Sequence, residues 1–148
     1  MSFKSTTAMP FGTIGIDLDG RFVGRGSTGA ISLPRADPQV RYRAVSAYGD
    51  DVCVLRVDGD VDCQLFHNKL FTVRGPFESI GLGAHFCGLQ TGRLVCQDLN
   101  TIRFGKDYVE DPSTSVAAGI PRGDYVQVSC GSNHCCARAG GRAGRSIL

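Results

Sequence analysis

The sequence predicts an all-β fold built from antiparallel hairpin repeats. A unit that contains an aromatic residue, a β-branched residue and a cysteine recurs along the chain, and self-similarity of this kind is typical of repeat architectures. Each copy places short apolar runs on either side of a glycine-containing turn, as hairpins do. The connecting stretches 32–39 and 111–123 each contain two prolines and show no helical periodicity, so little helix is expected.

Each clear copy opens with an aromatic residue that is followed three positions later by a β-branched one. These pairs are Tyr42 and Val45, Phe77 and Ile80, and Tyr125 and Val128. A cysteine follows the branched residue after seven, six and seven intervening positions, at Cys53, Cys87 and Cys136. The copies span 42–64, 77–97 and 125–148, and the last one is incomplete.

The second half of the unit is a turn and a return strand. Leu55 and Leu89 stand two positions after the first cysteine, and Gly59 or Gly92 lies in the turn that follows. A second cysteine and a glutamine complete the first two copies, whereas Arg138 replaces the leucine in the third. A fainter copy over about 11–34 repeats the strand, turn and strand order, with Ile16, Leu18, Gly20, Phe22 and Gly24 in the corresponding places.

Hairpin register predicts two disulfides. A three-residue loop at 57–59 places Cys53 opposite Cys63, and a two-residue loop in the next copy places Cys87 opposite Cys96. Directly opposed cysteines on paired strands have β-carbons close enough to bridge. We therefore expect both disulfides in an oxidising compartment, with buried free thiols as the alternative.

The return strand of the first copy alternates in polarity. Val61 and Cys63 share one face, whereas Asp60 and Asp62 point to the other, which predicts one face in water. The run 58–62 (DGDVD) resembles a calcium loop, but the required glycine and distal glutamate positions hold other residues. We expect a hairpin turn with a solvated acidic face.

Other cysteines and histidines offer ligands for zinc. The candidates are His85, Cys87, Cys130, His134, Cys135 and Cys136. Their spacing argues against a zinc site, so no metal and no cofactor are expected, and a zinc titration would decide the question. The roles of Cys130 and Cys135 stay open.

A cysteine and histidine pair could also supply a nucleophile and its base. No Gly-x-Ser-x-Gly elbow, phosphate loop or dinucleotide fingerprint accompanies them, and the repeat register already accounts for the thiols. We expect no catalytic and no cofactor-binding residues, and hence no enzyme.

Composition bounds the partners and the compartment. The 16 basic and 14 acidic side chains leave a formal charge of +2, which does not provide the positive field of a nucleic-acid binder. No apolar run reaches the roughly 20 residues of a membrane span, and the first residues lack the pattern of a signal peptide. Seven cysteines, however, favour an extracytoplasmic location.

The repeated unit resembles the repeats of the regulator of chromosome condensation, especially their cysteine-bearing relatives in bacterial proteins and crinkly-type plant receptor kinases. The matching residues are Tyr42, Val45, Ser46, Ala47, Cys53, Leu55, Asp58, Gly59 and Cys63. The chain departs from the family where Gln64 and Gln97 replace a tryptophan and Tyr48 replaces a glycine.

The resemblance implies a β-propeller with one four-stranded blade per repeat. Three or four copies are too few for a typical closed ring, so we expect a single repeat domain over 1–148 that forms a partial propeller. Missing repeats or a homo-oligomer would complete it. The stretch 106–123 is expected to be an inserted surface loop, and 138–148 a flexible tail.

By the same resemblance, the expected function is protein–protein interaction through loops at one face. Family relatives include a nucleotide-exchange factor for a small GTPase, a propeller-type β-lactamase inhibitor and receptor ectodomains. The alternatives are therefore an intracellular regulator of a small GTPase and a disulfide-stapled fragment of a receptor ectodomain. The partner remains an unknown protein or peptide.

Overall fold

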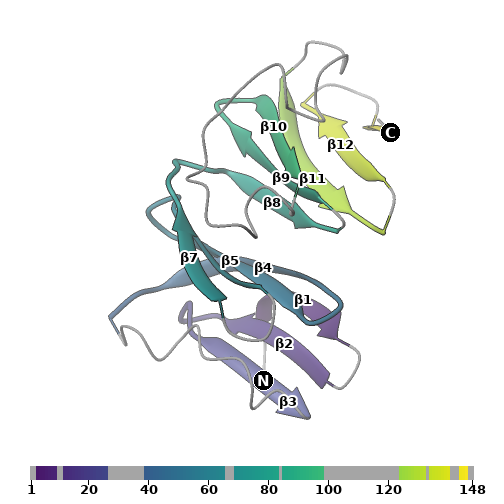
Figure 1. Cartoon of the computed structure of the whole chain (residues 1–148). Helices are drawn as coiled ribbons and strands as arrows, with labels where there is room; N and C mark the ends of the chain where they lie inside the picture. The colour runs from purple at the N-terminus through teal and green to yellow at the C-terminus, as the bar shows by residue number, and fades with distance from the viewer. Residues whose placement is uncertain are drawn as a thin grey trace. The chain divides into compact units, whose positions relative to one another are not determined.

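All regular elements in the described part of the chain are β-strands. The computed structural model describes residues 3–9, 12–26, 39–65, 69–83, 85–98, 124–132, 134–140 and 144–146. Their thirteen strands form four antiparallel sheets (Figure 1). Within each sheet, every strand pairs with the strand that is next to it in sequence. The prediction of an all-β fold made of antiparallel hairpins is therefore confirmed.

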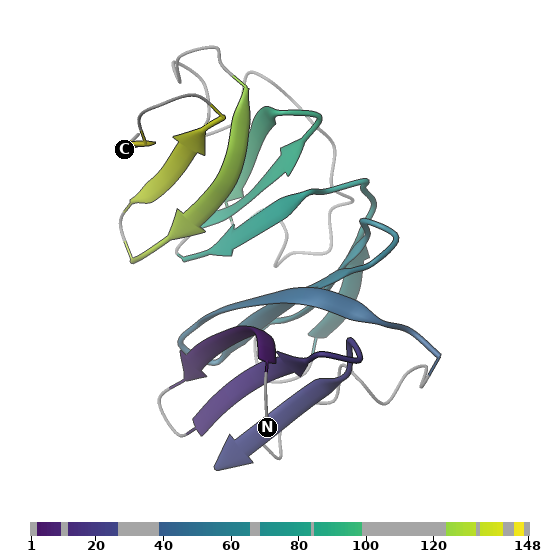
Figure 2. The same ribbon diagram turned by 180° about the vertical axis from the view of Figure 1, so that it is seen from behind.

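The strands gather in two compact units, residues 1–76 and 77–148. The first unit contains a three-stranded sheet, coloured purple in Figure 2, and a four-stranded sheet, coloured blue to teal. The strands of the first sheet are β1 (Phe3–Met9), β2 (Gly12–Asp17) and β3 (Phe22–Gly26). Those of the second sheet are β4 (Tyr42–Tyr48), β5 (Asp51–Arg56), β6 (Val61–Leu65) and β7 (Lys69–Val73).

The second unit contains two three-stranded sheets. The third sheet consists of β8 (Ser79–Leu82), β9 (His85–Gln90) and β10 (Arg93–Asp98). The fourth consists of β11 (Tyr125–Cys130), β12 (Cys135–Ala139) and β13 (Gly144–Ser146). Each clear sequence copy thus begins a sheet.

Apolar side chains pack between the two sheets of each unit. In the first unit, Ile14 and Ile16 of β2 pack with residues of β4 and β5, namely Tyr42, Val45, Val52 and Val54. In the second, the buried cluster is Cys87, Leu89, Cys96, Tyr125, Val128, Cys135 and Ala137. Tyr42 and Val45, and likewise Tyr125 and Val128, therefore face the neighbouring sheet of their unit. Phe77 and Ile80, which open the remaining copy, are also buried.

Turn glycines fix the hairpin register. Gly59 has φ 99°, and its N–H donates to the carbonyl of Arg56 at 3.1 Å, which closes the three-residue loop 57–59. In the next hairpin, Thr91 and Gly92 both have positive φ, at 49° and 76°, as a tight two-residue loop requires. Both loops have the length that the sequence predicts.

The ends of the copies differ from the sequence-based expectation. The first sheet begins at Phe3, earlier than the fainter copy expected from about residue 11, because β1 pairs with β2. Within the expected tail 138–148, β13 pairs with β12 as a third strand. The expected inserted loop 106–123 lies outside the described residues.

Candidate functional site

Strand register places the framework residues of the copies at equivalent positions. The β-branched residue of each copy pairs with one position of the next strand: Val45 with Val54, Ile80 with Gly88, and Val128 with Ala137. The adjacent pairs bring in the framework cysteines: Ser46 with Cys53, Gly81 with Cys87, and Ser129 with Cys136. Cys136 therefore occupies the position of the first cysteine of the unit.

The first sheet follows the same register without cysteines. Thr6 pairs with Gly15 and Thr7 with Ile14, so Ile14 stands at the cysteine position. Ile14 in turn pairs with Gly24, at the place of the second cysteine. The signal that the sequence reading missed is Phe3, which is followed three positions later by the β-branched Thr6.

The aromatic residue of two copies lies against a glycine of the next strand. A Cβ added at Gly88 would collide with the ring of Phe77, and one added at Gly15 would lie 2.8 Å from Cδ1 of Phe3. Phe77 is fully buried and packs edge-on against Phe86, with ring centroids 5.7 Å apart. Glycine at these positions is required so that the opening ring can cover the strand.

Two disulfides join the cysteine pairs that hairpin register predicts. Cys53 is bonded to Cys63 and Cys87 to Cys96, with Cα–Cα distances of 4.1 Å in both pairs. All four side chains are at most 2% exposed. Each bridge lies within one sheet and links the two strands of one hairpin.

The last hairpin uses a different pair. Cys130 and Cys135 are opposed across β11 and β12 and form a third disulfide that sequence reasoning left open. Cys136 is in no disulfide, because its register partner on β13 is Ser146 rather than a second cysteine. The sequence signal for this bridge is the hairpin register, because a four-residue loop at 131–134 places Cys130 opposite Cys135.

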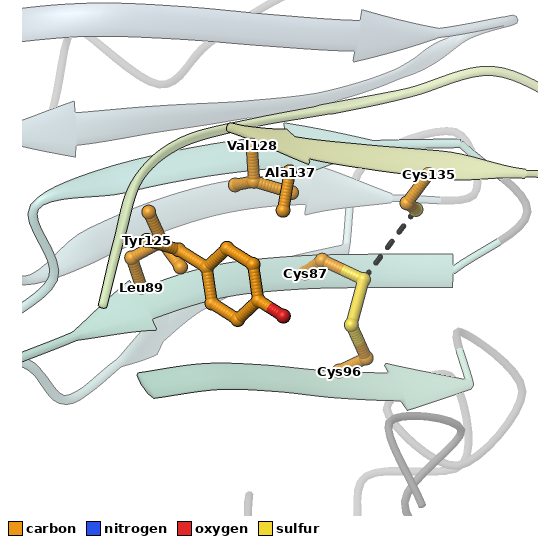
Figure 3. Packing of buried hydrophobic residues seen from close by; sticks show 7 residues of the cluster. All are labelled: Cys87, Leu89, Cys96, Tyr125, Val128, Cys135 and Ala137. Atoms are coloured by element: carbon orange, nitrogen blue, oxygen red, sulfur yellow. Dashed lines mark hydrogen bonds between the residues drawn. A yellow bond between two sulfur atoms is a disulfide. The ribbon is translucent and has the colours of Figure 1, made fainter. Parts of the chain in front are cut away.

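Two of the disulfides touch each other in the core of the second unit. The Sγ atoms of Cys87 and Cys135 lie 3.4 Å apart, and Figure 3 shows this contact beside the bond from Cys87 to Cys96. Since both sulfur atoms are in disulfides, neither carries a proton, and the contact is one of van der Waals packing. Gly81 permits the approach, because a Cβ there would lie 3.0 Å from Sγ of Cys130.

In each unit, an equivalent backbone hydrogen bond links the two sheets. The N–H of Tyr42 donates to the carbonyl of Gly20 at 2.7 Å, and the N–H of Tyr125 donates to that of Gly92 at 3.1 Å. In each case, a turn glycine of one sheet accepts from the aromatic residue that opens the next sheet. This hydrogen bond therefore fixes the first residue of the strand to the turn of the preceding sheet.

Serine hydroxyls make the second link. The N–H of Val45 donates to Oγ of Ser5, and the N–H of Val128 donates to Oγ of Ser79, both at 3.1 Å. Ser5 and Ser79 each stand two positions after the opening phenylalanine of their copy. Two of the four copies therefore include a serine that accepts a hydrogen bond from the following copy, which the sequence did not reveal.

The expectation of a solvated acidic face on β6 is wrong for Asp62. Its carboxylate is largely buried and accepts from Nε and Nη2 of Arg56, both at 2.7 Å. It also accepts from the hydroxyls of Thr72 and Tyr42, at 2.8 Å and 3.1 Å. The physical reason is that Asp62 pairs with Val54 on the face that packs against the first sheet, so a charged residue there is buried and must be paired.

The hydrogen bonds that Arg56 donates to Asp62 raise the pKa of Arg56 above its ordinary value, and burial opposes this rise. A raised pKa in the folded protein means that the stabilisation is fully present below the ordinary arginine pKa. It is lost only as the pH rises through the folded value. Arg56 therefore keeps its charge from neutral to mildly alkaline pH, and the ion pair serves as a structural bond within the sheet.

The hairpin turns of the first unit form an exposed surface, which we call the turn surface: Leu18, Asp19, Val40, Arg41, Val57 and Asp58. Leu18 and Val57 occupy the same place in equivalent Asp-Gly turns and are 60% and 58% exposed. The N–H of Val57 donates to the carbonyl of Arg41 at 3.0 Å, next to the bond from Tyr42 to Gly20. Both turns are therefore held against the start of β4.

A hollow of about 390 Å³ opens on the turn surface. Its lining consists of Gln39, Val40, Arg41, Arg56, Val57 and Asp58. Aliphatic carbon, two guanidinium groups and one carboxylate thus surround the same space. Such a combination can accept an apolar side chain and make polar contacts around it.

Solved structures with this fold are β-propellers, although no family model and no curated protein matches the sequence. The ectodomain of the receptor kinase CR4 from Physcomitrella patens is 21% identical, with TM-score 0.66 over 96% of this chain and 40% of that chain. The CRINKLY WD40 ectodomain of the receptor kinase ACR4 from Arabidopsis thaliana is 17% identical, with TM-score 0.61 over 92% of this chain and 45% of that chain.

Prp20p from Saccharomyces cerevisiae is 12% identical, with TM-score 0.56 over 91% of this chain and 42% of that chain. The chain therefore spans less than half the length of these three structures. The likeness shows the fold, which is a partial β-propeller made of antiparallel sheets. In the part of the chain that the structure describes, there is no helix that is long and apolar enough to cross a membrane.

Proposed function

We propose that the chain is a non-enzymatic protein-interaction module that binds a protein or peptide at the turn surface of its first unit. One observation carries this proposal. Two equivalent turns, each held to the start of β4 by a backbone hydrogen bond, expose Leu18 and Val57, and Val57 lines a hollow together with Arg41 and Asp58.

The turn surface combines features that binding sites share. Exposed aliphatic side chains on rigid turns lose little conformational entropy when they are covered, and a charged rim gives orientation and specificity. The fourth sheet offers a natural comparison, because Val126 of β11 is also an exposed aliphatic, at 47%, but it is not one of the residues that line this hollow. We therefore expect Val57 to contribute to binding and Val126 to contribute little.

The three disulfides support an oxidising, extracytoplasmic location as part of this proposal. The finer assignment that we favour is a divergent, cysteine-bearing relative of the regulator of chromosome condensation repeats within a larger or oligomeric propeller. Receptor ectodomains are among the proteins of similar fold, and so is Prp20p, a protein with binding properties toward Gsp1p and histones. An intracellular regulator of a GTPase is the alternative, and it requires that the repeats tolerate reduced cysteines.

Site-specific photo-crosslinking in the native host tests the proposal. The photoreactive residue p-benzoylphenylalanine is incorporated at Val57, at Leu18 and, as the matched control, at Val126. We expect a discrete crosslinked species of the same mass from Val57 and Leu18 and none from Val126. Mass spectrometry then identifies the partner, and its affinity is measured with purified proteins.

Charge substitution provides the quantitative measurement. Val57→Glu replaces an aliphatic side chain that lines the hollow by a carboxylate. We expect it to weaken binding at least tenfold, which is about 1.4 kcal/mol. Val126→Glu should leave the affinity unchanged. Equal affinity for wild type and Val57→Glu, or crosslinking from Val126 alone, would move the binding site away from the turn surface.

A further inference from the structure

Three cysteine sulfurs from two neighbouring hairpins lie close together in the second unit, and a fourth is bonded to one of them. The Sγ atoms of Cys87, Cys130 and Cys135 all lie within 4.8 Å of one another. Cys96 is bonded to Cys87 and stands opposite it in the strand register. The fourth sheet therefore contributes two sulfurs to this cluster, and the third sheet contributes Cys87 with Cys96 bonded to it. Of these four cysteines, only Cys130 is partly exposed.

We propose that these four cysteines form a tetrathiolate site for zinc when their two disulfides are reduced. A tetrahedral zinc with bonds to sulfur of about 2.3 Å places its sulfur ligands roughly 3.8 Å apart. The sulfurs of Cys87 and Cys135 already lie at 3.4 Å, and the group of three spans no more than 4.8 Å. Small side-chain rotations convert this arrangement into a tetrahedron.

The chemistry balances through an external reductant. A phosphine or dithiol supplies four electrons, and four protons are taken up as the two sulfur–sulfur bonds break to give four thiols. Zinc binding then replaces the four S–H bonds by four Zn–S bonds and releases the protons, so the affinity rises with pH. In the oxidised protein the same sulfurs are held in disulfides and bind no metal.

The site differs from the zinc set that the sequence suggested. Neither His85 nor His134 belongs to the group of sulfurs within 4.8 Å, and Cys136 is also outside it. The ligands come instead from cysteine pairs opposed across two hairpins. Gly81 makes this possible, because its missing side chain leaves space for Cys130 to approach the third sheet.

The consequence is a link that the disulfides do not provide. The bond from Cys87 to Cys96 lies within the third sheet and that from Cys130 to Cys135 within the fourth. A bound zinc would join β9 and β10 to β11 and β12. A reducing compartment would thus exchange two bridges within sheets for one bridge between them.

Cobalt titration of the reduced protein tests this site. The whole chain is reduced anaerobically with a phosphine, transferred to buffer without reductant and titrated with Co²⁺, followed by Zn²⁺. We expect thiolate-to-cobalt charge-transfer absorption and visible bands of tetrahedral cobalt that saturate at one equivalent and disappear when zinc is added. Cys87→Ser and Cys135→Ser should each abolish the stoichiometric saturation.

Matched variants separate this site from other thiols. The double substitution Cys53→Ser and Cys63→Ser removes an equally buried pair from the first unit, and Cys136→Ser removes the free thiol beside Cys135. Both should bind cobalt as wild type does. Far-ultraviolet circular dichroism follows the fold, and if the reduced chain unfolds without metal, the titration is repeated with zinc present during reduction.

Four outcomes would overturn the proposal. The first is a reduced, folded chain that does not bind cobalt stoichiometrically, and the second is cobalt binding that survives Cys87→Ser. The third is loss of cobalt binding in the double variant Cys53→Ser and Cys63→Ser. The fourth is unfolding of the reduced chain that zinc does not prevent. Refolding by one equivalent of zinc would support the proposal as directly as the spectrum does.

Discussion

Arg56 and Asp62 face each other across the hairpin of β5 and β6 in a two-pronged ion pair, with Nε and Nη2 each 2.7 Å from a carboxylate oxygen. The side chains are only 26% and 11% exposed, so water screens the pair weakly. Thr72 and Tyr42 complete the shell of the carboxylate from β7 and β4. The network therefore joins all four strands of the second sheet.

Breaking this pair should cost more than a surface ion pair. Arg56→Met keeps most of the side-chain length but leaves the Asp62 charge largely buried without its cation, which costs on the order of 2–3 kcal/mol. We expect that decrease in the free energy of unfolding, measured by urea denaturation. Because the pKa of Arg56 is raised, the decrease should be the same from neutral to mildly alkaline pH.

Arg74 and Asp60 provide the matched control. Their ion pair is longer, at 3.2 Å, and the Arg74 side chain is 86% exposed. Arg74→Met should therefore lower the free energy of unfolding by less than about 1 kcal/mol. Equal effects of the two substitutions would mean that the buried pair gives no net stabilisation.

The serine links predict equal effects in the two units. Ser5→Ala and Ser79→Ala each remove the acceptor of one partly buried N–H, from Val45 or Val128, and a hydrogen bond of this kind contributes about 1 kcal/mol. Urea denaturation should give similar losses for both. Ser129→Ala is the control, because its side chain is exposed, and it should change stability by less than about 0.5 kcal/mol.

A clear difference between Ser5→Ala and Ser79→Ala would contradict the equivalence of the two links. The same conclusion would follow if Ser129→Ala destabilised the protein as much as they do. Amide hydrogen exchange offers a second measurement, since the N–H groups of Val45 and Val128 should lose protection in their own variant only.

Two turn glycines should differ sharply on substitution by alanine. Gly83 and Gly49 follow the first strand of the third and second sheets, respectively. A Cβ at Gly83 would fall on the carbonyl oxygen of Gly131, whereas a Cβ at Gly49 would meet nothing within 4 Å. Gly83→Ala should therefore shift backbone and cost about 3 kcal/mol or more, since packed atoms must move.

Gly49→Ala carries only the cost of its backbone conformation, φ 58°, which is roughly 1 kcal/mol. Thermal unfolding of the two variants beside wild type measures the difference. Similar melting temperatures for both variants would show that the turn at Gly83 relaxes at no cost. The close approach of Gly83 to Gly131 would then not be required for stability.

The sequence predicts those features that local register determines. Once Gly59 and Gly92 set the loop lengths, counting outward pairs Cys53 with Cys63 and Cys87 with Cys96, the pairs that the structure joins. Features that depend on a neighbouring sheet escape such counting. The burial of Asp62 is one of them, because polarity alternation along β6 does not reveal that the first sheet covers the face on which Asp62 lies.

The missed serines have the same cause. Ser5 and Ser79 do not act on their own hairpins, since each accepts a hydrogen bond from the first strand of the following copy. A search that compares only cysteines and aromatics within a copy does not weigh such residues. The contact between Cys87 and Cys135 likewise joins residues 48 positions apart, and no local rule predicts it.

Thiol counting predicts one free cysteine in the oxidised protein. Seven cysteines less the six in three disulfides leave Cys136. Denatured protein from its native host should therefore take up one alkyl group without reduction and seven after reduction, as measured by intact mass.

The discriminating observation is the link from Cys130 to Cys135 in a non-reducing peptide map, because the repeat alone would favour Cys136 as the bonded residue. A map that bonds Cys136 would place the last hairpin in another register, and seven free thiols would favour the intracellular regulator, in which the zinc site could then form.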